Sequence, residues 1–410
     1  MRDTQLYTEI LGLKSPWHIK TVDLNTVKET INLRVDILTN KLPCPICQKQ
    51  SPIYDHRKER KWRHLDSCQL KTYIICSIPR IKCKDHGVLT IKIPWAHNSD
   101  RVSIQFERLA IDLLLATKNQ TKTSQMLRIN FKVLHNIMEK AVNRGLSRRN
   151  DHKIKYIGID EKSMWKGHTY LTVLSNTEER CVIDVCESRT KPATKSLLNR
   201  GLTIKQRNKI EAVSIDMWKA YIEATKESLP NSIIVHDKFH IMKYLNEAVD
   251  KTRKKEVRKL NKKGDKRLKN TKYMFLKNKE NLTVKQLTKF QEIQSLNLEV
   301  SKAWTAKENF REFFKCETLN EAKFFFAEWY NDIYNNSLDK MKEVGKLLIR
   351  HSEGLLNYIK HQISNAVAEW LNSKIQEIKF IGRGFRAFDN YRIAILFFLG
   401  KLNLYPHNSP

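Results

Sequence analysis

Four residues with the chemistry of zinc ligands form two short pairs near the start of the chain. Cys44 and Cys47 enclose two residues, Cys83 and His86 do the same, and 35 residues separate the pairs. A two-residue gap lets both ligands of a turn point at one ion, and tetrahedral zinc takes four such ligands. The set leaves no coordination position open, so we expect a structural zinc ion. In the alternative interpretation, Cys83 and His86 are ordinary residues of a β-hairpin.

Other cysteines and histidines of this region have different expected roles. Cys68 and Cys76 alternate with apolar residues in or beside strand-like sequence, which favours core thiols. His56 and His64 lie in the basic run DHRKERKWRH and are alternative zinc ligands or phosphate contacts. We expect this run to form a surface that faces DNA.

Two aspartates end hydrophobic, strand-like segments in the middle of the chain. Asp160 ends the segment YIGID, and Asp216 ends the segment AVSID. A carboxylate at the end of a buried strand is held rigidly at the rim of a sheet, and two such groups can chelate a hard divalent cation. Either residue could instead be the N-cap of the next helix, and Asp216 does precede the helical segment MWKAYIEA.

A third carboxylate is expected on a helix near the end of the chain. Between about Ser364 and Ile378, one helical face carries polar residues and another carries apolar ones; the polar residues are Asn365, Glu369, Asn372 and Gln376. Glu369 can therefore face the rim of the sheet while the apolar face packs. The alternative is a solvated helix face.

The order of elements decides how these acids meet. The segment before Asp237 reads as βββαβαβ, which is the order of a ribonuclease-H-like fold, where the first and fourth strands are neighbours. Asp160 and Asp216 would then converge. The following segment, DKFH, places His240 one turn into a helix. There it either contacts substrate phosphate or has a structural role at the edge of the core.

A pair of helices ahead of these strands resembles a helix-turn-helix. The segment TKTSQMLRINFKVLHNIMEKAV fits two helices joined by a turn near Ile129 and Asn130, with Phe131 and the apolar residues after it turned inward. The outward residues expected to reach phosphates or base edges are Lys132, His135, Asn136 and Lys140. The alternative is a generic helical pair within a larger domain.

A basic helical segment separates the second aspartate from the glutamate. From Lys251 to Lys277 there are thirteen Lys and Arg residues and two acids, so we expect contact with a polyanion rather than a solvated helix or linker. The residues expected to contact DNA here are Lys254, Lys255 and Arg258. Arg383, Arg386 and Arg392 form a second candidate phosphate surface. Trp304 and Trp329 are expected in the core, with stacking on a distorted base as the alternative.

Composition limits the class of protein. The 410 residues carry 75 Lys and Arg against 44 Asp and Glu, a net charge of +31, which indicates a polyanionic partner. No apolar run approaches the length of a membrane span, and the N-terminus does not resemble a signal peptide. Eight unevenly spaced cysteines do not suggest a disulfide framework, so we expect a cytoplasmic, nucleoid-associated protein without membrane contact.

These observations predict an α/β multidomain protein. It would comprise an N-terminal zinc-binding β module, a three-helix helix-turn-helix domain and a ribonuclease-H-like mixed-sheet catalytic domain interrupted by an all-helical insertion. The expected segments are residues 1–40 (N-terminal segment), 41–100 (zinc-binding module), 101–150 (helix-turn-helix), 151–245 (first catalytic part), 246–340 (basic helical insertion) and 341–410 (second catalytic part with the third acid).

In combination, these motifs resemble the insertion-sequence L-three (ISL-three) family of transposases. The resemblance rests on CPIC and CKDH, on GIDE and SIDMWKAY followed by HDKFH, and on NAVAEWLNSKIQEIK with GRGFRAFDNYR. It implies that Asp160, Asp216 and Glu369 are a DDE triad, and that Asp237 and His240 are the DxxH element. The residue after Glu369 departs from the expected pattern, because it is a tryptophan and not a small residue.

Such a triad would bind two Mg²⁺ ions, for which Mn²⁺ can substitute, and would catalyse DNA cleavage and strand transfer. The expected partners are the terminal inverted repeats of an insertion sequence and target DNA, bound by a homodimer or higher oligomer. The main alternative is a catalytically inactive, sequence-specific DNA-binding regulator derived from a transposase. A third possibility is a zinc-dependent structural protein of a nucleoprotein complex.

Overall fold

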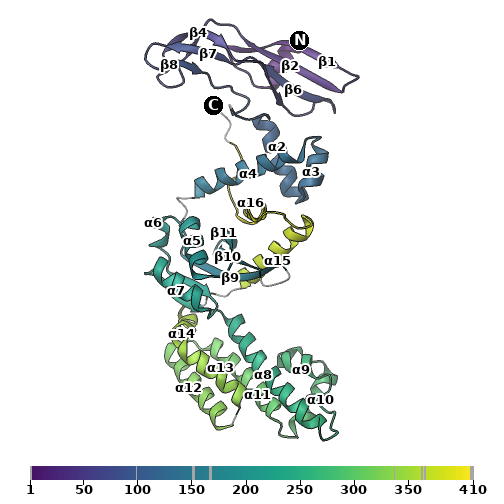
Figure 1. Ribbon diagram of the computed structural model, residues 1–410, viewed down its shortest axis with the longest axis vertical. Coiled ribbons are helices and arrows are strands. Elements are labelled where there is room, and N and C mark those ends of the chain that lie inside the picture. Colours follow the sequence, from purple (N-terminus) through teal and green to yellow (C-terminus); the bar gives the residue numbers. More distant parts are fainter. Residues whose placement is uncertain are drawn as a thin grey trace. The chain divides into compact units, whose positions relative to one another are not determined.

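The computed structural model divides the chain into two compact units, residues 1–148 with 402–410 and residues 149–401 (Figure 1). The described residues are 2–97, 99–149, 153–165, 169–336, 338–361, 363 and 366–406. In this part of the chain, every helix is too short or too polar to cross a membrane.

The first unit begins with two four-stranded sheets. One has the order β1 (Trp17–Asn25), β2 (Thr30–Ile37), β6 (Lys71–Cys76), β5 (Arg60–Arg63), and the other has the order β3 (Lys41–Pro43), β4 (Gln50–His56), β7 (Pro79–Cys83), β8 (Gly87–Thr90). The short helix α1 (Asp3–Ile10) precedes them. Leu33, Trp62 and Ile74 are among the buried side chains that form a common core. The N-terminal segment, to which the sequence assigned no strands, therefore supplies two strands to the β-rich region.

Two predictions about side chains in this region were wrong. Cys68 is exposed, because it lies in a tight turn with a φ of 51° between β5 and β6, whereas Cys76 is buried as expected. His64 does not face outward but is 5% exposed, and its Nδ1 lies 2.8 Å from Ser103 Oγ. Ser103 is the N-cap of the first helix after the sheets, so packing of that helix buries the histidine.

Three helices follow: α2 (Ile104–Thr117), α3 (Gln120–Met126) and α4 (Phe131–Arg148). The side chains of Ser103 and Asn119 cap α2 and α3, and Lys118 ends α2 in the left-handed conformation. Most of the expected inner face of α4 is buried, including Leu134 and Met138. Phe131 is an exception at 49% exposed, because it starts the helix and stacks on His135 at its outer surface.

The second unit contains a five-stranded mixed sheet of order β11-β10-β9-β12-β13. Its strands are β9 (Tyr156–Trp165), β10 (Thr169–Asn176), β11 (Cys181–Glu187), β12 (Ala212–Ile215) and β13 (Ile233–His236). The first three strands are antiparallel, and β12 pairs in parallel with both β9 and β13. The predicted adjacency of the first and fourth strands is therefore confirmed.

Helices cover both faces of this sheet. Figure 1 shows α5 (Lys191–Gly201) and α7 (Lys219–Ser228) on one side, and α15 (Ala366–Ile381) and α16 (Phe388–Leu399) on the other. Ile157 and Ile159 of β9 pack in the core that includes α5 and α7. Because side chains alternate along a strand, Asp160 points to the opposite face, toward α15. The small helix α6 (Ile204–Arg207) was not predicted.

A helical array lies between β13 and α15. It consists of α8 (Lys238–Asn261), α9 (Lys272–Leu276), α10 (Val284–Gln294), α11 (Glu299–Phe310), α12 (Leu319–Asn335), α13 (Asp339–Arg350) and α14 (Ser352–His361), with two short 3₁₀ turns. Trp304 and Trp329 are each 5% exposed in its core, as expected, which excludes stacking on a base in this conformation. The array adjoins the sheet, because Asn357 of α14 donates a hydrogen bond to Ile234 O of β13 at 3.0 Å.

The chain from α13 to α15 is helical but is not one continuous helix. The structure has three helices there, with a break at His351, where φ is −114° and ψ is 20°. Both Ser337 and the predicted start of the last helix near Ser364 lie outside the described residues. The apolar pattern alone did not reveal the break at His351, because α13 and α14 both bury their apolar residues in the same core.

Candidate zinc centre and candidate active site

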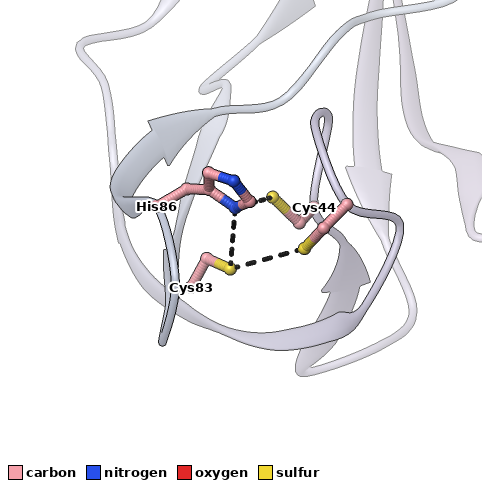
Figure 2. Close-up of side chains that lie close together, drawn as sticks. Cys44, Cys83 and His86 are labelled. Carbon is pink, nitrogen blue, oxygen red and sulfur yellow. Dashed lines mark hydrogen bonds between the residues drawn. The ribbon is translucent and has the colours of Figure 1, made fainter.

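The four predicted zinc ligands converge at one point. Figure 2 shows Cys44, Cys83 and His86 directed toward one another, and Cys47 completes the group, whose ligand atoms all lie within 4.8 Å of each other. Cys44 Sγ is 3.8 Å from His86 Nδ1, Cys83 Sγ is 3.6 Å from the same nitrogen, and the sulfurs of Cys47 and Cys83 are 3.7 Å apart. Zinc bonds of about 2.0–2.3 Å in a tetrahedron require ligand separations of roughly 3.5–3.8 Å. The side chains therefore fit a structural zinc ion.

Two hairpin-like turns position these ligands. The first pair follows β3, where the amide of Gln48 donates to Cys44 O at 2.9 Å and Gln48 has a φ of 60°. The second pair joins β7 to β8, and Gly87, at a φ of 69°, closes that turn. A hydrogen bond from His86 lowers the pKa of the Cys83 thiol to about 6, which favours the thiolate that zinc requires.

The sheet register places three aspartates next to one another. Ile159 pairs with Ile215 across β9 and β12, and Ile215 pairs with His236 across β12 and β13. The next residue along each strand is Asp160, Asp216 or Asp237, respectively. Three carboxylates therefore follow one another across three parallel strands. The alternative role of Asp216 as a helix N-cap does not apply, because Trp218 occupies that position of α7.

His240 lies among these carboxylates. It belongs to the first turn of α8, whose N-cap is Asp237, and is 9% exposed. Its Nε2 is 3.4 Å from Asp160 Oδ1, and its Nδ1 is 3.7 Å from Asp216 Oδ2. Burial opposes the charge on His240, but Asp160 and Asp216 outweigh it and raise its pKa. The imidazole thus offsets part of the negative charge of the cluster.

Helix α15 brings Glu369 and Asn372 toward the same cluster. Asn372 Nδ2 donates a hydrogen bond to Asp160 Oδ2 at 2.7 Å. Partial burial, followed by the charges of Asp237 and Asp160, raises the pKa of the Glu369 carboxyl. Glu369 therefore shares the electrostatic environment of the aspartates although its side chain is exposed. The sequence showed Asn372 one helical turn after Glu369, but nothing in the sequence indicated its bond to Asp160.

Comparison with known proteins identifies the family. A family model described as a transposase matches residues 157–395, which is more than half of the chain and contains all of these acidic residues. The chain belongs to the ISL-three family of transposases. A second model, described as the zinc-finger of the transposases IS204, IS1001, IS1096 and IS1165, matches residues 42–86, the segment that holds the four zinc ligands.

Similar transposases cover nearly the whole chain. The transposase for insertion sequence element IS1557 of Mycobacterium tuberculosis is 25% identical over 94% of this chain and 93% of its own length. The transposase for insertion sequence element IS1001 of Bordetella parapertussis is 22% identical over 93% of each chain. The predicted family and its zinc finger are therefore confirmed, and membership of this family implies DNA as the partner.

A network beside the carboxylates of this transposase was not visible in the sequence. Arg189, between β11 and α5, pairs with Glu161 at 3.1 Å, and its guanidinium lies 4.1 Å from the ring of Tyr170 and 4.7 Å from that of Trp218. Trp218 Nε1 donates to Arg189 O at 3.2 Å. The network connects the residue after Asp160 to the segment after β12. Its members are too far apart in the chain for any motif to reveal it.

The basic residues predicted on the outer face of α4 differ in their surroundings. Lys132 and Asn136 are exposed, and His135 Nδ1 lies 3.3 Å from Gln120 Oε1 of α3. Lys140 forms an ion pair with the buried Asp100. That ion pair engages the ammonium group within the first unit, so Lys140 is less available than Lys132.

The predicted basic residues of the second unit fall into two groups. Lys254 and Lys255 of α8 are exposed but pair with acids: Lys254 with Asp250 at 2.8 Å, and Lys255 with Glu299 at 3.6 Å. The exposed residues Arg258, Arg383 and Arg386 are at the surface of α8 and of the turn between α15 and α16. Arg392 differs, because its Nε and Nη2 donate hydrogen bonds to the two carboxylate oxygens of the buried Asp184 of β11. That ion pair anchors α16 on the sheet and makes Arg392 a structural residue.

Proposed function

We propose that this transposase binds the ends of an insertion sequence and catalyses Mg²⁺-dependent cleavage and strand transfer at Asp160, Asp216 and Glu369. The observation that carries the proposal is the register of the parallel strands, which sets Asp160 beside Asp216. Helix α15 adds support, because it is tied to Asp160 through Asn372 and carries Glu369 one turn earlier.

The strand order supports a ribonuclease-H-like organisation of the second unit. The order β11-β10-β9-β12-β13, with three antiparallel strands followed by two parallel ones, is the arrangement expected from the βββαβαβ sequence pattern. The helical array enters after β13, between the second aspartate and the glutamate. On this proposal the array is an insertion into the catalytic fold.

The donor set suits Mg²⁺. Hard divalent cations of this kind prefer carboxylate oxygens, and the residues that would hold them are Asp160, Asp216 and Glu369. Burial raises the pKa of the neighbouring Asp237, and the charge of Asp160 acts in the same direction, as expected where carboxylates gather without enough positive charge. Bound Mg²⁺ or Mn²⁺ would activate the attacking hydroxyl and stabilise the leaving oxygen at phosphorus.

The protein residues around the acids have separate tasks. Asn372 fixes the orientation of the Asp160 carboxylate through the hydrogen bond to Oδ2. His240, whose ring nitrogens lie 3.4 Å from Asp160 and 3.7 Å from Asp216, can contact the scissile phosphate from the first turn of α8. Arg189 holds Glu161 away from Asp160, on the opposite face of β9.

End recognition is assigned to the first unit. The arrangement of α3 and α4 supports a helix-turn-helix in which Lys132, His135 and Asn136 of α4 contact DNA. The zinc finger would fix the β-sheet that precedes these helices. Two or more chains are expected to act together, because a transposon has two ends.

The test uses a labelled duplex that carries the terminal inverted repeat found beside the coding sequence. The full-length protein should nick this end in Mg²⁺, whereas Asp160→Asn and Asp216→Asn should bind it with unchanged affinity and cleave at the background rate. Asp389→Asn, an exposed aspartate of α16, is the matched control and should cleave normally. Full activity of Asp160→Asn would exclude the proposed site, and binding without cleavage by the wild-type protein would favour the DNA-binding regulator.

A further inference from the structure

A cavity of about 720 Å³ adjoins the first turns of α8, next to the candidate active site. Phe239, Lys243, Asn246, Asp250 and Lys254 line it from one face of the helix, because they recur at intervals of three or four residues. His240 is the immediate neighbour of Phe239 and faces the aspartates. The same helix therefore carries a residue of the acidic cluster and, beside it, one wall of the cavity.

The cavity combines an apolar floor with a basic rim. Phe239, which is 52% exposed, Met242 and Leu276 supply the apolar surface. The cations around it are Lys238, Lys243, Lys251, Lys254, Lys272 and Arg311. Two acids, Glu247 and Asp250, also line the cavity, so the rim is net positive. A single exposed phenylalanine is common on protein surfaces, but here it lines the same cavity as six cations.

Only some of these cations are neutralised. Arg311 pairs with Glu280 and Glu308, and Lys254 pairs with Asp250. Among the described residues, Lys243 and Lys251 have no ion-pair partner, and both are exposed. These two lysines lie about one and three turns after Phe239 on α8, about 12 Å apart along the helix, so they can bind separate phosphates of a strand whose base lies on the ring.

A second cavity continues the basic surface along α8. It measures about 780 Å³, shares Lys251 and Lys254 with the first, and is lined by eight Lys and Arg residues and by no acid. From His240 to Asn261, at 1.5 Å per residue, the helix spans about 32 Å. The two cavities form one track, which we call the α8 groove, that leads away from the acidic cluster.

We propose that the α8 groove binds an unpaired segment of DNA strand, with a base against Phe239 and phosphates on Lys243 and Lys251. Duplex DNA presents mainly phosphates to a protein surface and would leave the apolar floor unused. An unpaired nucleotide offers both a base face and a phosphate, which is how single strands are bound elsewhere. The volume of the first cavity lies within the range of about 300–1,000 Å³ that is usual for ligand sites.

This inference rests on the proposed function, because the strand in question is the one that leaves the scissile phosphate. Cleavage breaks one strand at the scissile phosphate, and the nicked strand can then separate from its partner strand. A groove that starts beside the acidic cluster can hold that separated strand while the other strand reacts.

The first test compares two fluorescein-labelled probes, (dT)15 and a 15-bp mixed-sequence duplex, bound to the full-length protein without divalent metal. Phe239→Ala should weaken (dT)15 binding by about 5- to 150-fold, the range for loss of one base stacked on an aromatic ring, and leave duplex binding unchanged. Phe324→Ala on α12, which removes a phenylalanine that is 66% exposed outside the groove, is the matched control. Equal binding of (dT)15 by these two variants would overturn the proposal.

The second test measures the salt dependence of (dT)15 binding. Lys243→Ala with Lys251→Ala should reduce the slope of log K against log salt by about 1.4, because each phosphate contact of a single strand contributes about 0.7. Lys285→Ala with Lys289→Ala, two exposed lysines of α10 that line neither cavity, should leave the slope unchanged. The same reduction in both double variants would mean that the contacts are non-specific and would overturn the proposal.

A third measurement uses the unaltered protein, so that folding of a variant is not in question. 5-Iododeoxyuridine placed within (dT)15 should cross-link to the peptide that contains Phe239 and Met242. Cross-links spread over other basic surfaces, without this peptide, would overturn the proposal. The results distinguish failure of the proposed groove from failure of the proposed active site. If the protein nicks DNA ends but Phe239→Ala does not weaken (dT)15 binding, only the groove proposal is wrong. If Phe239→Ala weakens (dT)15 binding but the protein does not nick DNA ends, only the catalytic proposal is wrong.

Discussion

Replacement of Asn372 by alanine tests how the carboxylate of Asp160 is held. The change removes a 2.7 Å hydrogen bond from Nδ2 to Asp160 Oδ2. A hydrogen bond to a charged group contributes about 1.5–3 kcal/mol, and each 1.4 kcal/mol is a factor of ten, so the loss corresponds to roughly 10- to 100-fold. Residues that orient metal ligands have effects of this same size, about 10- to 100-fold, on metal affinity or activity.

The assay is the initial rate of end nicking as a function of Mg²⁺ concentration. Asn372→Ala should raise the half-saturating Mg²⁺ concentration by about tenfold or more and leave DNA binding without metal unchanged. Thermal stability should fall as well, because the hydrogen bond to the buried Asp160 carboxylate also stabilises the fold, so the Mg²⁺ dependence and not the melting temperature tests the positioning role. Gln376→Ala, an exposed residue one turn later on α15, is the control. Identical Mg²⁺ dependence of the two variants would refute the positioning role of Asn372.

Three further predictions concern the scaffold. Cys47→Ser should remove about one bound zinc ion per chain and weaken binding of DNA ends without unfolding the second unit, as metal analysis, binding and thermal unfolding would show. Wild-type protein that is purified without a chelator, contains no zinc and still binds DNA ends would contradict this. Burial lowers the pKa of His64 to about 4, so the unfolded state takes up a proton before the folded state does as the pH falls below about 6.5. The free energy of unfolding of the first unit should therefore fall by up to about 3 kcal/mol by pH 4. In urea titrations, the free energy of unfolding of His64→Gln should depend less on pH than that of the wild type. Gly354→Ala should destabilise the second unit by about 1–2 kcal/mol, because the new Cβ would lie 2.6 Å from His236 Nε2. This steric overlap outweighs the gain of about 1 kcal/mol in helix propensity. An unchanged or raised melting temperature would contradict the prediction.

The sequence predicted the parts of the site whose position depends on local spacing. The zinc ligands are an example, because a two-residue gap fixes each pair and the hairpins bring the pairs together. Asp160 and Asp216 are another, because both end strands whose parallel pairing follows from the order of elements. In each case a short-range pattern and a simple rule of chain topology were sufficient.

Features that depend on tertiary packing were missed or wrong. The basic run around His64 suggested a surface, yet α2 covers the histidine, and the neighbouring Arg63 is 6% exposed against Phe106. Arg392 looked like a phosphate contact, but a buried aspartate 208 residues away in the chain binds it. The bond between Asn372 and Asp160 depends on how α15 packs along β9, which no spacing within either segment encodes.

The most direct test of the account is the location of Mn²⁺ by anomalous scattering in crystals of the full-length protein bound to its DNA end. Mn²⁺ is expected within about 2.0–2.2 Å of carboxylate oxygens of Asp160 and Asp216, with Glu369 completing the same metal centre. Mn²⁺ bound elsewhere, or Glu369 in solvent with another acid in its place, would contradict the assignment of Asp160, Asp216 and Glu369 as the catalytic triad.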